Sequence, residues 1–195
     1  MVIVLVGVAL ITGAILAYVN HITTGPIKEQ AEKTLTDGIK KVMGGGEITV
    51  TGSDPYSQTV DGKELTYVIH KVNDAQGKDL GAAVESTTVG FGGDLKVLVG
   101  FDSNGNILGY TILQTAETPG LGAKAETWLQ KDGKGSIIGM NPSAELKVSK
   151  DGGQVNAITA STITSRAFLK AVNNAYSAYK KSSAGSQNVA SNDNK

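Results

Sequence analysis

The chain has 195 residues, including 18 lysines and arginines, 18 aspartates and glutamates, and no cysteine. This length suits about one domain with a substantial core. A net charge of zero argues against a nucleic-acid partner, which would need a basic face. The lack of cysteine excludes disulfides, thiol catalysis and an iron–sulfur cluster on the chain's own thiolates. With His21 and His70 as its two histidines, the chain is expected to hold no metal.

The N-terminal residues are apolar without interruption. Residues 1–19, MVIVLVGVALITGAILAYV, carry no charged side chain, and about 20 apolar residues match the hydrocarbon core of a bilayer. A cleaved signal peptide is the alternative, but this stretch is longer than the usual apolar region and has neither a basic leader nor an A-x-A-like site. We therefore predict an uncleaved single-pass anchor over residues 1–21. Without acidic or basic groups at depth, it is not expected to conduct ions by itself.

The main domain is predicted to cover residues 22–181, and its first element is a helix. Gly25-Pro26 marks a break in the chain, because proline suits the first turn of a new helix. Apolar residues then recur every three or four positions over residues 27–42, which is typical of an amphipathic helix. Three consecutive glycines at 44–46 end it.

The pattern then changes to two-residue alternation, which predicts strands rich in Val, Ile, Thr and Tyr. Asn104-Gly105 indicates a tight hairpin between the last two strands, because glycine accepts a positive φ. The five predicted strands are Glu47–Thr51, Glu64–Asn73, Leu80–Thr87, Asp94–Asp102 and Ile107–Gln114.

The last third of the chain is predicted to be mixed. A short helix is expected over Ala123–Lys131, a strand over Glu145–Lys150, and a long helix with one apolar stripe from about Ile163 to Tyr179. Residues 182–195, rich in Ser, Asn, Gly and Ala, are predicted to be a disordered tail. The expected fold class is α+β, with an antiparallel sheet and flanking helices after a single N-terminal transmembrane helix.

Three patterns favour structural interpretations over functional ones. Asp102–Asn106 resembles the start of a calcium loop, but Ile107 stands where the loop needs glycine, so a hairpin turn is favoured. Gly90–Gly93 differs from G-x-G-x-x-G and precedes a strand, which favours a bend and leaves close approach to a flat ligand open. His70 has no partner nearby in the sequence, so a Ser-His-Asp arrangement has no support.

Two segments are candidates for a binding site. Residues 117–122, ETPGLG, place a proline and two glycines around one leucine, which on composition alone is a turn. Residues 156–166, NAITASTITSR, carry five hydroxyls directly before a helix. Helix capping explains these hydroxyls. The same geometry also forms an anion site suited to phosphate, to which Arg166 would add charge.

Together these segments resemble the FMN-binding domain of membrane redox pumps, in its RnfG type, which is related to the NqrC type. The residues Thr159 to Thr162, TAST, resemble the flavinylation motif Ser/Thr-Gly/Ala-Ala/Ser-Thr. Residues 87–124, which include ETPGLG, are similar to the RnfG type as well. The chain departs from the commoner Gly-Ala at Ala160 and Ser161. The resemblance runs from the anchor to about Tyr179.

The resemblance implies one covalent FMN per chain. Thr162 would carry it as a phosphoester, made by a separate flavin transferase that uses FAD and Mg²⁺. The ETPGLG turn would lie against the isoalloxazine ring. The implied cofactor-binding residues are Thr162, Thr159, Ser161, Ile163, Thr164 and Ser165 at the start of the helix, and Glu117, Thr118, Gly120, Leu121 and Gly122 in the turn.

The resemblance also implies an electron relay without catalysis of its own. The chain would be a subunit of a membrane-bound Rnf-type ferredoxin:NAD oxidoreductase in a bacterial or archaeal cell membrane, with ion transport left to other subunits. Its flavin domain would lie on the extracytoplasmic side. The alternatives are the equivalent flavin subunit of an NADH:quinone pump, and a membrane-anchored binding or structural module without a cofactor.

Overall fold

The computed structural model describes residues 1–60 and 63–190, and it divides into two compact units, the first over Met1–Asp37 and the second beginning at Gly38. Helix α1 spans Val2–Val42 and makes up nearly all of the first unit. Among the described residues it is the one helix long and apolar enough to cross a membrane. Its large apolar side chains from Met1 to Ile22 are exposed, as lipid contact would require.

The break predicted at Gly25-Pro26 is wrong, because α1 continues through both residues. A proline removes one helical hydrogen bond, whereas a helix end at this point would remove several. The predicted end at the three glycines is confirmed. Gly44, Gly45 and Gly46 have φ values of 92°, 73° and 112°, and the Gly45 N–H donates to the Lys40 carbonyl at 2.9 Å.

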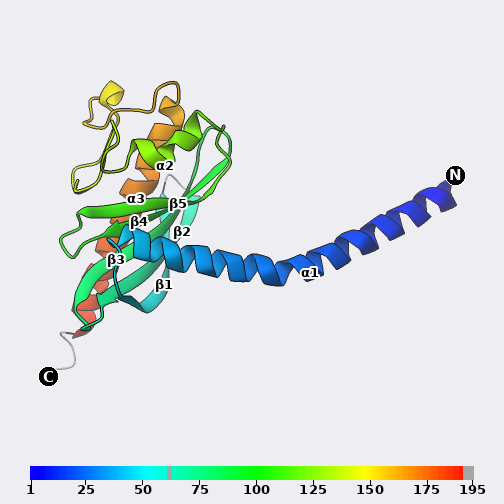
Figure 1. Ribbon diagram of the computed structural model, residues 1–195, viewed down its shortest axis with the longest axis horizontal. Helices are drawn as coiled ribbons and strands as arrows, with labels where there is room; N and C mark the ends of the chain where they lie inside the picture. The colour runs from blue at the N-terminus through cyan, green and yellow to red at the C-terminus, as the bar shows by residue number, and fades with distance from the viewer. Residues whose placement is uncertain (61–62, 191–195) are drawn as a thin grey trace. The chain divides into compact units, whose positions relative to one another are not determined.

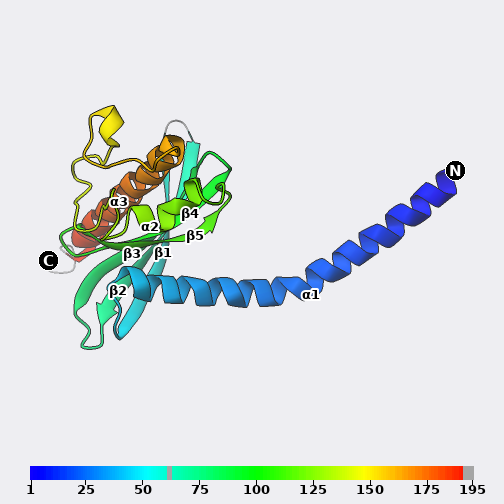
Figure 2. The ribbon, with the colours of Figure 1, turned by 45° about the horizontal axis from the view of Figure 1, so that its top comes forward.

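The second unit is built on one antiparallel sheet (Figures 1 and 2), whose strands follow the order β1-β2-β3-β4-β5. This architecture confirms the α+β prediction, and all five predicted strands are present. Their bounds are Ile48–Val60 for β1, Lys63–Asp74 for β2, Asp79–Val89 for β3, Asp94–Phe101 for β4 and Ile107–Thr115 for β5.

The predicted hairpin between β4 and β5 is confirmed in detail. Asp102 Oδ1 accepts the N–H groups of Asn104 at 2.9 Å and Asn106 at 2.8 Å. Gly105 has a φ of 85°, in the region that glycine reaches without strain. The Asp102 carboxylate is therefore engaged by the turn itself, which agrees with a hairpin in place of a calcium loop.

Strand β1 is longer than predicted, because it runs on from Thr51 to Val60 through Pro55. Proline is usually a strand breaker, but β1 is an edge strand, where a missing N–H costs little.

The predicted helix over Ala123–Lys131 is present in shorter form. A 3₁₀ turn, η1 (Gly122–Lys124), leads into α2 (Ala125–Trp128).

The predicted strand over Glu145–Lys150 is wrong. Val148 makes a single bridge with Val155, and a 3₁₀ turn, η2 (Ser149–Asp151), follows directly. Leu146 and Val148 are buried, so the apolar alternation marks core contacts of an irregular segment. This segment lies between α2 and the last helix, and it adds two buried side chains to the core.

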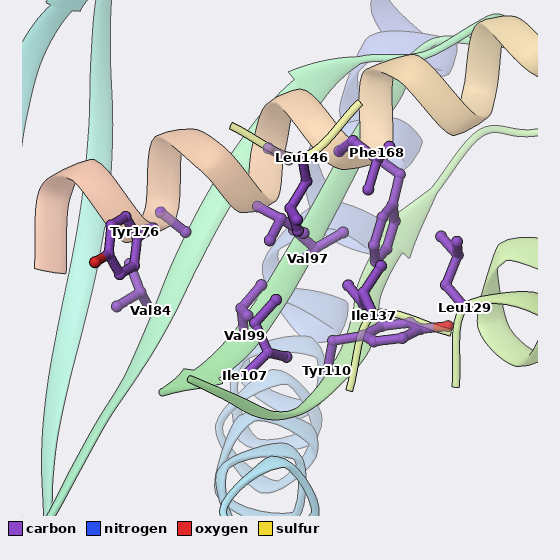
Figure 3. Close-up of a cluster of buried hydrophobic side chains, with 14 of the residues drawn as sticks. Val84, Val97, Val99, Ile107, Tyr110, Leu129, Ile137, Leu146, Phe168 and Tyr176 are labelled. Atoms are coloured by element: carbon purple, nitrogen blue, oxygen red, sulfur yellow. The ribbon is translucent and has the colours of Figure 1, made fainter. Parts of the chain in front are cut away.

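Helix α3 (Thr162–Ala190) crosses one face of the sheet in Figures 1 and 2. Its predicted apolar stripe is confirmed, because Phe168, Val172 and Tyr176 are buried against the strands. In Figure 3 Phe168 lies over Tyr110, and their ring centroids are 4.8 Å apart. Of the predicted tail from Ser182, residues up to Ala190 are assigned to α3, and residues 191–195 lie outside the described part.

The opposite face of the sheet receives the last turn of α1. Gly100 on β4 and Gly109 on β5 are paired across the two strands. A Cβ on either glycine would approach the Val42 carbonyl oxygen, to 2.5 Å at Gly100 and 2.9 Å at Gly109. The glycine pair therefore makes the room in which α1 ends against the sheet.

Candidate functional site

Three segments that are far apart in the sequence meet in one pocket of about 420 Å³. They are the bend after β3, the ETPGLG turn after β5, and the start of α3. This volume lies in the range of small-molecule sites, roughly 300–1,000 Å³. The pocket is lined by Phe91, Glu117, Thr118, Leu121, Gly122, Ala160, Ser161, Thr162, Ile163 and Thr164.

The ETPGLG segment forms a tight turn followed by the 3₁₀ turn η1. The Leu121 N–H donates to the Thr118 carbonyl at 3.2 Å, and Gly120 has a φ of 76°. Proline before a glycine of positive φ is typical of a type II turn. The turn leaves Leu121 43% exposed at the wall of the pocket, as an apolar contact for a flat ligand.

Glu117 is buried at the centre of the three segments. Its Oε1 accepts the Phe91 N–H at 2.7 Å, and its Oε2 accepts the Thr164 hydroxyl at 3.0 Å. One carboxylate thus connects the bend after β3 and the first turn of α3 to the ETPGLG turn. Hydrogen bonds to a carboxylate are stronger than those between neutral groups.

Glycines fit around this carboxylate where no larger residue would. A Cβ at Gly90 would collide with Glu117 Oε1, and one at Gly122 would collide with Oε2. A Cβ at Gly92 would meet the Ala116 carbonyl oxygen. The bend predicted at Gly90–Gly93 is confirmed, with the Gly90 N–H donating to the Gly93 carbonyl at 2.8 Å.

The start of α3 faces the pocket with backbone donors. Ser161 precedes the helix and Thr162 is its first residue. The first N–H groups of an α-helix have no partner within the helix, and the helix dipole favours an anion at this end. The pocket therefore combines an apolar wall with an anion-binding end, as a ligand with a flat ring and a phosphate requires.

Ala160 holds the turn before α3 in an unusual conformation. Its φ of 61° is the one positive value of a non-glycine residue among those described. Left-handed backbone costs an alanine about 1–2 kcal/mol. Glycine, which the flavinylation motif commonly has at this position, would avoid that cost.

The hydroxyls predicted to hold a phosphate have different roles in the structure. Thr162 is half-buried and lines the pocket, and Ser161 is buried and lines it as well. Thr164 is buried and donates to Glu117. Ser165 is fully buried, where its Oγ accepts the Ile158 N–H and donates to the Ser161 carbonyl, both at 2.9 Å. Thr162 and Ser161 are therefore the hydroxyls placed for a ligand.

Three other sequence candidates lie apart from the pocket lining. Thr159 and Gly120 are exposed residues outside it. Arg166 donates to both oxygens of Asp151, at 2.7 Å from Nε and 2.6 Å from Nη2. The expectation that Arg166 adds charge to an anion site is therefore wrong. Its hydrogen bonds lower the pKa of the Asp151 carboxyl below its ordinary range.

Sequence reasoning did not select Phe91 as a site residue. Phe91 is 68% exposed and lines the pocket from the glycine bend. The signal was present, because a large aromatic residue between glycines has little to pack against within its own segment. Its neighbours come from residues 117–122 and 160–164, which short-range patterns do not bring together.

A second polar cluster lies on the sheet, where His70 contacts residues of the two neighbouring strands. His70 is buried, with Nδ1 2.8 Å from Ser53 Oγ and Nε2 2.8 Å from Glu85 Oε1. Lys96 Nζ pairs with Glu85 Oε2 at 2.5 Å. Burial alone would raise the pKa of Glu85, but the hydrogen bonds from His70 and Lys96 outweigh it and lower the pKa. None of these four residues lines the pocket at the start of α3.

No group of three or more His, Cys, Asp or Glu residues in the described parts of the chain is arranged to hold a metal ion.

The donors and apolar side chains of the pocket fit FMN. It offers helix N–H groups and hydroxyls for a phosphate, and Phe91, Leu121 and Ile163 for a ring.

Comparisons with known proteins find a matching family model and similar chains. A model of the FMN-binding domain family matches residues 90–177, which include all three segments of the pocket. The chain is similar to the G subunit of the ion-translocating oxidoreductase complex of Shewanella baltica, with 31% identity over 86% of this chain and 82% of the relative. The same subunit of Photorhabdus laumondii is 33% identical over 84% of this chain and 81% of the relative. That of Vibrio parahaemolyticus is 33% identical over 84% and 80%.

Proposed function

Because this chain belongs to the family of G subunits of ion-translocating oxidoreductase complexes, we propose that it is the electron-transfer flavin subunit of an Rnf-type complex. The observation that carries the proposal is the pocket at the start of α3. It lies within the segment that matches the FMN-binding domain model, and Thr162 lines it together with Phe91, Leu121 and Ile163. FMN supplies the redox chemistry, and the chain supplies position and electrostatics.

Thr162 is the proposed attachment residue. It lines the pocket and is half-buried, whereas the hydroxyls of Thr164 and Ser165 are used by internal hydrogen bonds. In the proposed maturation step, Thr162 Oγ attacks the FMN phosphorus of FAD and forms a phosphoester. The pyrophosphate bond breaks, AMP leaves, and the hydroxyl proton is released. A separate flavin transferase with Mg²⁺ performs this step.

A covalent tether keeps the flavin on a domain where free FMN is scarce. It makes rebinding intramolecular, with a high effective concentration, so that a pocket with exposed walls at Leu121 and Ile163 does not lose its cofactor. We place this domain on the extracytoplasmic side, anchored by α1 near the other subunits. Those subunits exchange electrons with it and transport the ion.

The direct test is the mass of the full chain after production with a flavin transferase. We expect one FMN less one water on the wild type and on Thr127→Ala, because Thr127 is an exposed threonine of α2 outside both the motif and the pocket lining. Thr162→Ala should remain at its unmodified mass and show no flavin fluorescence after denaturation. Retained covalent flavin on Thr162→Ala would refute the attachment site, and a colourless wild type would favour a binding or structural module.

A further inference from the structure

We infer that Glu117 is the positioning residue of the flavin site, which fixes the pocket's three segments through one carboxylate and sets the electrostatic potential at the flavin. The inference rests on the proposed function and adds a role for a residue that the resemblance places only in the turn against the ring. Glu117 is 7% exposed, yet it lines the pocket.

The mechanical part of the role follows from the hydrogen bonds. The bend after β3 and the first turn of α3 are both connected to the ETPGLG turn by Glu117, which accepts from Phe91 N–H and from the Thr164 hydroxyl. Gly90 and Gly122 make room for the carboxylate, because a Cβ on either residue would lie against one of its oxygens. Without Glu117, the Phe91 N–H and the Thr164 hydroxyl lose their acceptor, and each buried group left unpaired costs about 1–3 kcal/mol.

Glu117 also determines which threonine hydroxyl at the start of α3 is available for flavin attachment. Thr162 and Thr164 are two residues apart at the start of α3. Both line the pocket, but the Thr164 hydroxyl donates to Glu117, whereas the Thr162 hydroxyl is not held by this carboxylate. The same contact therefore fixes the rotation of the first helical turn and leaves the Thr162 hydroxyl accessible to the transferase.

The electrostatic part follows from charge at short range. Both oxygens of Glu117 act as acceptors, a pattern that suits the ionised carboxylate. The carboxylate itself is buried, so water screens its negative charge little, and that charge disfavours further negative charge nearby. Glu117 is thus expected to make the flavin harder to reduce than the same site with a neutral side chain.

Two substitutions separate these roles. Glu117→Gln keeps the shape and removes the charge, because its amide oxygen accepts the Phe91 N–H and its amide nitrogen donates to the Thr164 hydroxyl. Glu117→Ala removes both contacts. Glu126→Gln is the matched control, since Glu126 is an exposed acidic residue on α2 outside the pocket, and the change in net charge is the same.

The experiment uses the full chain with and without the flavin transferase. In the flavin-free protein, we expect the Phe91 amide to exchange hydrogen roughly ten-fold faster in Glu117→Ala than in the wild type. The wild-type rate is expected in Glu126→Gln. In the co-produced protein, Glu117→Ala should incorporate flavin roughly ten-fold more slowly, which is the rate effect of losing about one hydrogen bond to a charged group. Glu117→Gln should incorporate it like the wild type and have a more positive midpoint potential than both the wild type and Glu126→Gln.

The inference is overturned if Glu117→Ala keeps the wild-type amide exchange and flavin incorporation, or if Glu117→Gln has the potential of Glu126→Gln. Should Glu117→Ala fail to fold, the midpoint potential of Glu117→Gln, compared with that of Glu126→Gln, decides whether the inference stands. A wild type that carries no flavin would count against the proposed function, while hydrogen exchange at Phe91 would still test the positioning role.

Discussion

Ala160 is the residue at which the site's local conformation costs most. Its φ of 61° is unfavourable for alanine by about 1–2 kcal/mol, part of which glycine loses again through its larger freedom in the unfolded chain. We expect Ala160→Gly to raise the free energy of unfolding by about 0.5–1 kcal/mol. Urea unfolding of the two proteins measures this, and a lower free energy in the glycine variant would contradict the conformational argument.

Glu85 provides a second prediction, on stability and pH. It is buried and paired with His70 and Lys96. Glu85→Gln keeps one acceptor and loses the charge, and breaking a buried pair costs about 2–4 kcal/mol near neutral pH. Denaturant unfolding at pH 7 should show this loss, whereas Glu145→Gln, at an exposed position, should change the free energy little.

The sign of the pH dependence of stability follows from the direction in which folding shifts the pKa of Glu85. The pKa of Glu85 lies below its ordinary value of 4.5 in the folded chain, so the unfolded chain binds its proton first as the pH falls. The contribution of Glu85 is therefore complete above about pH 4.5 and is lost as the pH falls through the lower folded-state pKa. The stability difference between wild type and Glu85→Gln should shrink in that range, and a difference that grows would be inconsistent with it.

Individual site residues could be predicted only in part. Thr162 and Leu121 belong to motifs that a short window contains, and both line the pocket. The contacts of Glu117 with Phe91 and Thr164 span 26 and 47 residues. Patterns within a short window carry no information on such pairs. For the same reason the sequence does not predict the pairing of Arg166 with Asp151.

At the scale of elements, the packing of the last turn of α1 against the sheet depends on two glycines, Gly100 and Gly109. A methyl group at Gly100 would press on the Val42 carbonyl, at 2.5 Å from its oxygen. We expect Gly100→Ala to lower the free energy of unfolding by about 1–3 kcal/mol, the usual cost of overpacking. Gly52→Ala on β1 is the control, since nothing lies within 4 Å of its added Cβ. Equal melting temperatures for both variants would argue against the close contact.

Regular elements are predicted well because their signal is local. Residue alternation locates all five strands, and asparagine with glycine locates the turn between β4 and β5. The failures have tertiary causes. Pro55 is tolerated because β1 is an edge strand, and Leu146 and Val148 alternate because both reach the core from an irregular segment.

At the scale of the whole molecule, the position of the flavin domain relative to the membrane can be measured directly. The chain has no cysteine, so Lys131→Cys, at an exposed position, introduces one unique thiol. We expect a membrane-impermeant maleimide to label this thiol in intact cells, because the domain is proposed to be extracytoplasmic. Labelling only after the cells are lysed would place the domain on the other side.

The central claim is that the hydroxyl of Thr162 carries FMN, and peptide mapping tests it most directly. Trypsin cleaves after Lys150 and Arg166 and releases one peptide, Asp151–Arg166, which contains all five candidate hydroxyls. For protein matured with a flavin transferase, we predict that fragment masses place the whole flavin phosphate on Thr162. An unmodified peptide, or a flavin on Thr159, Ser161, Thr164 or Ser165, would contradict the claim.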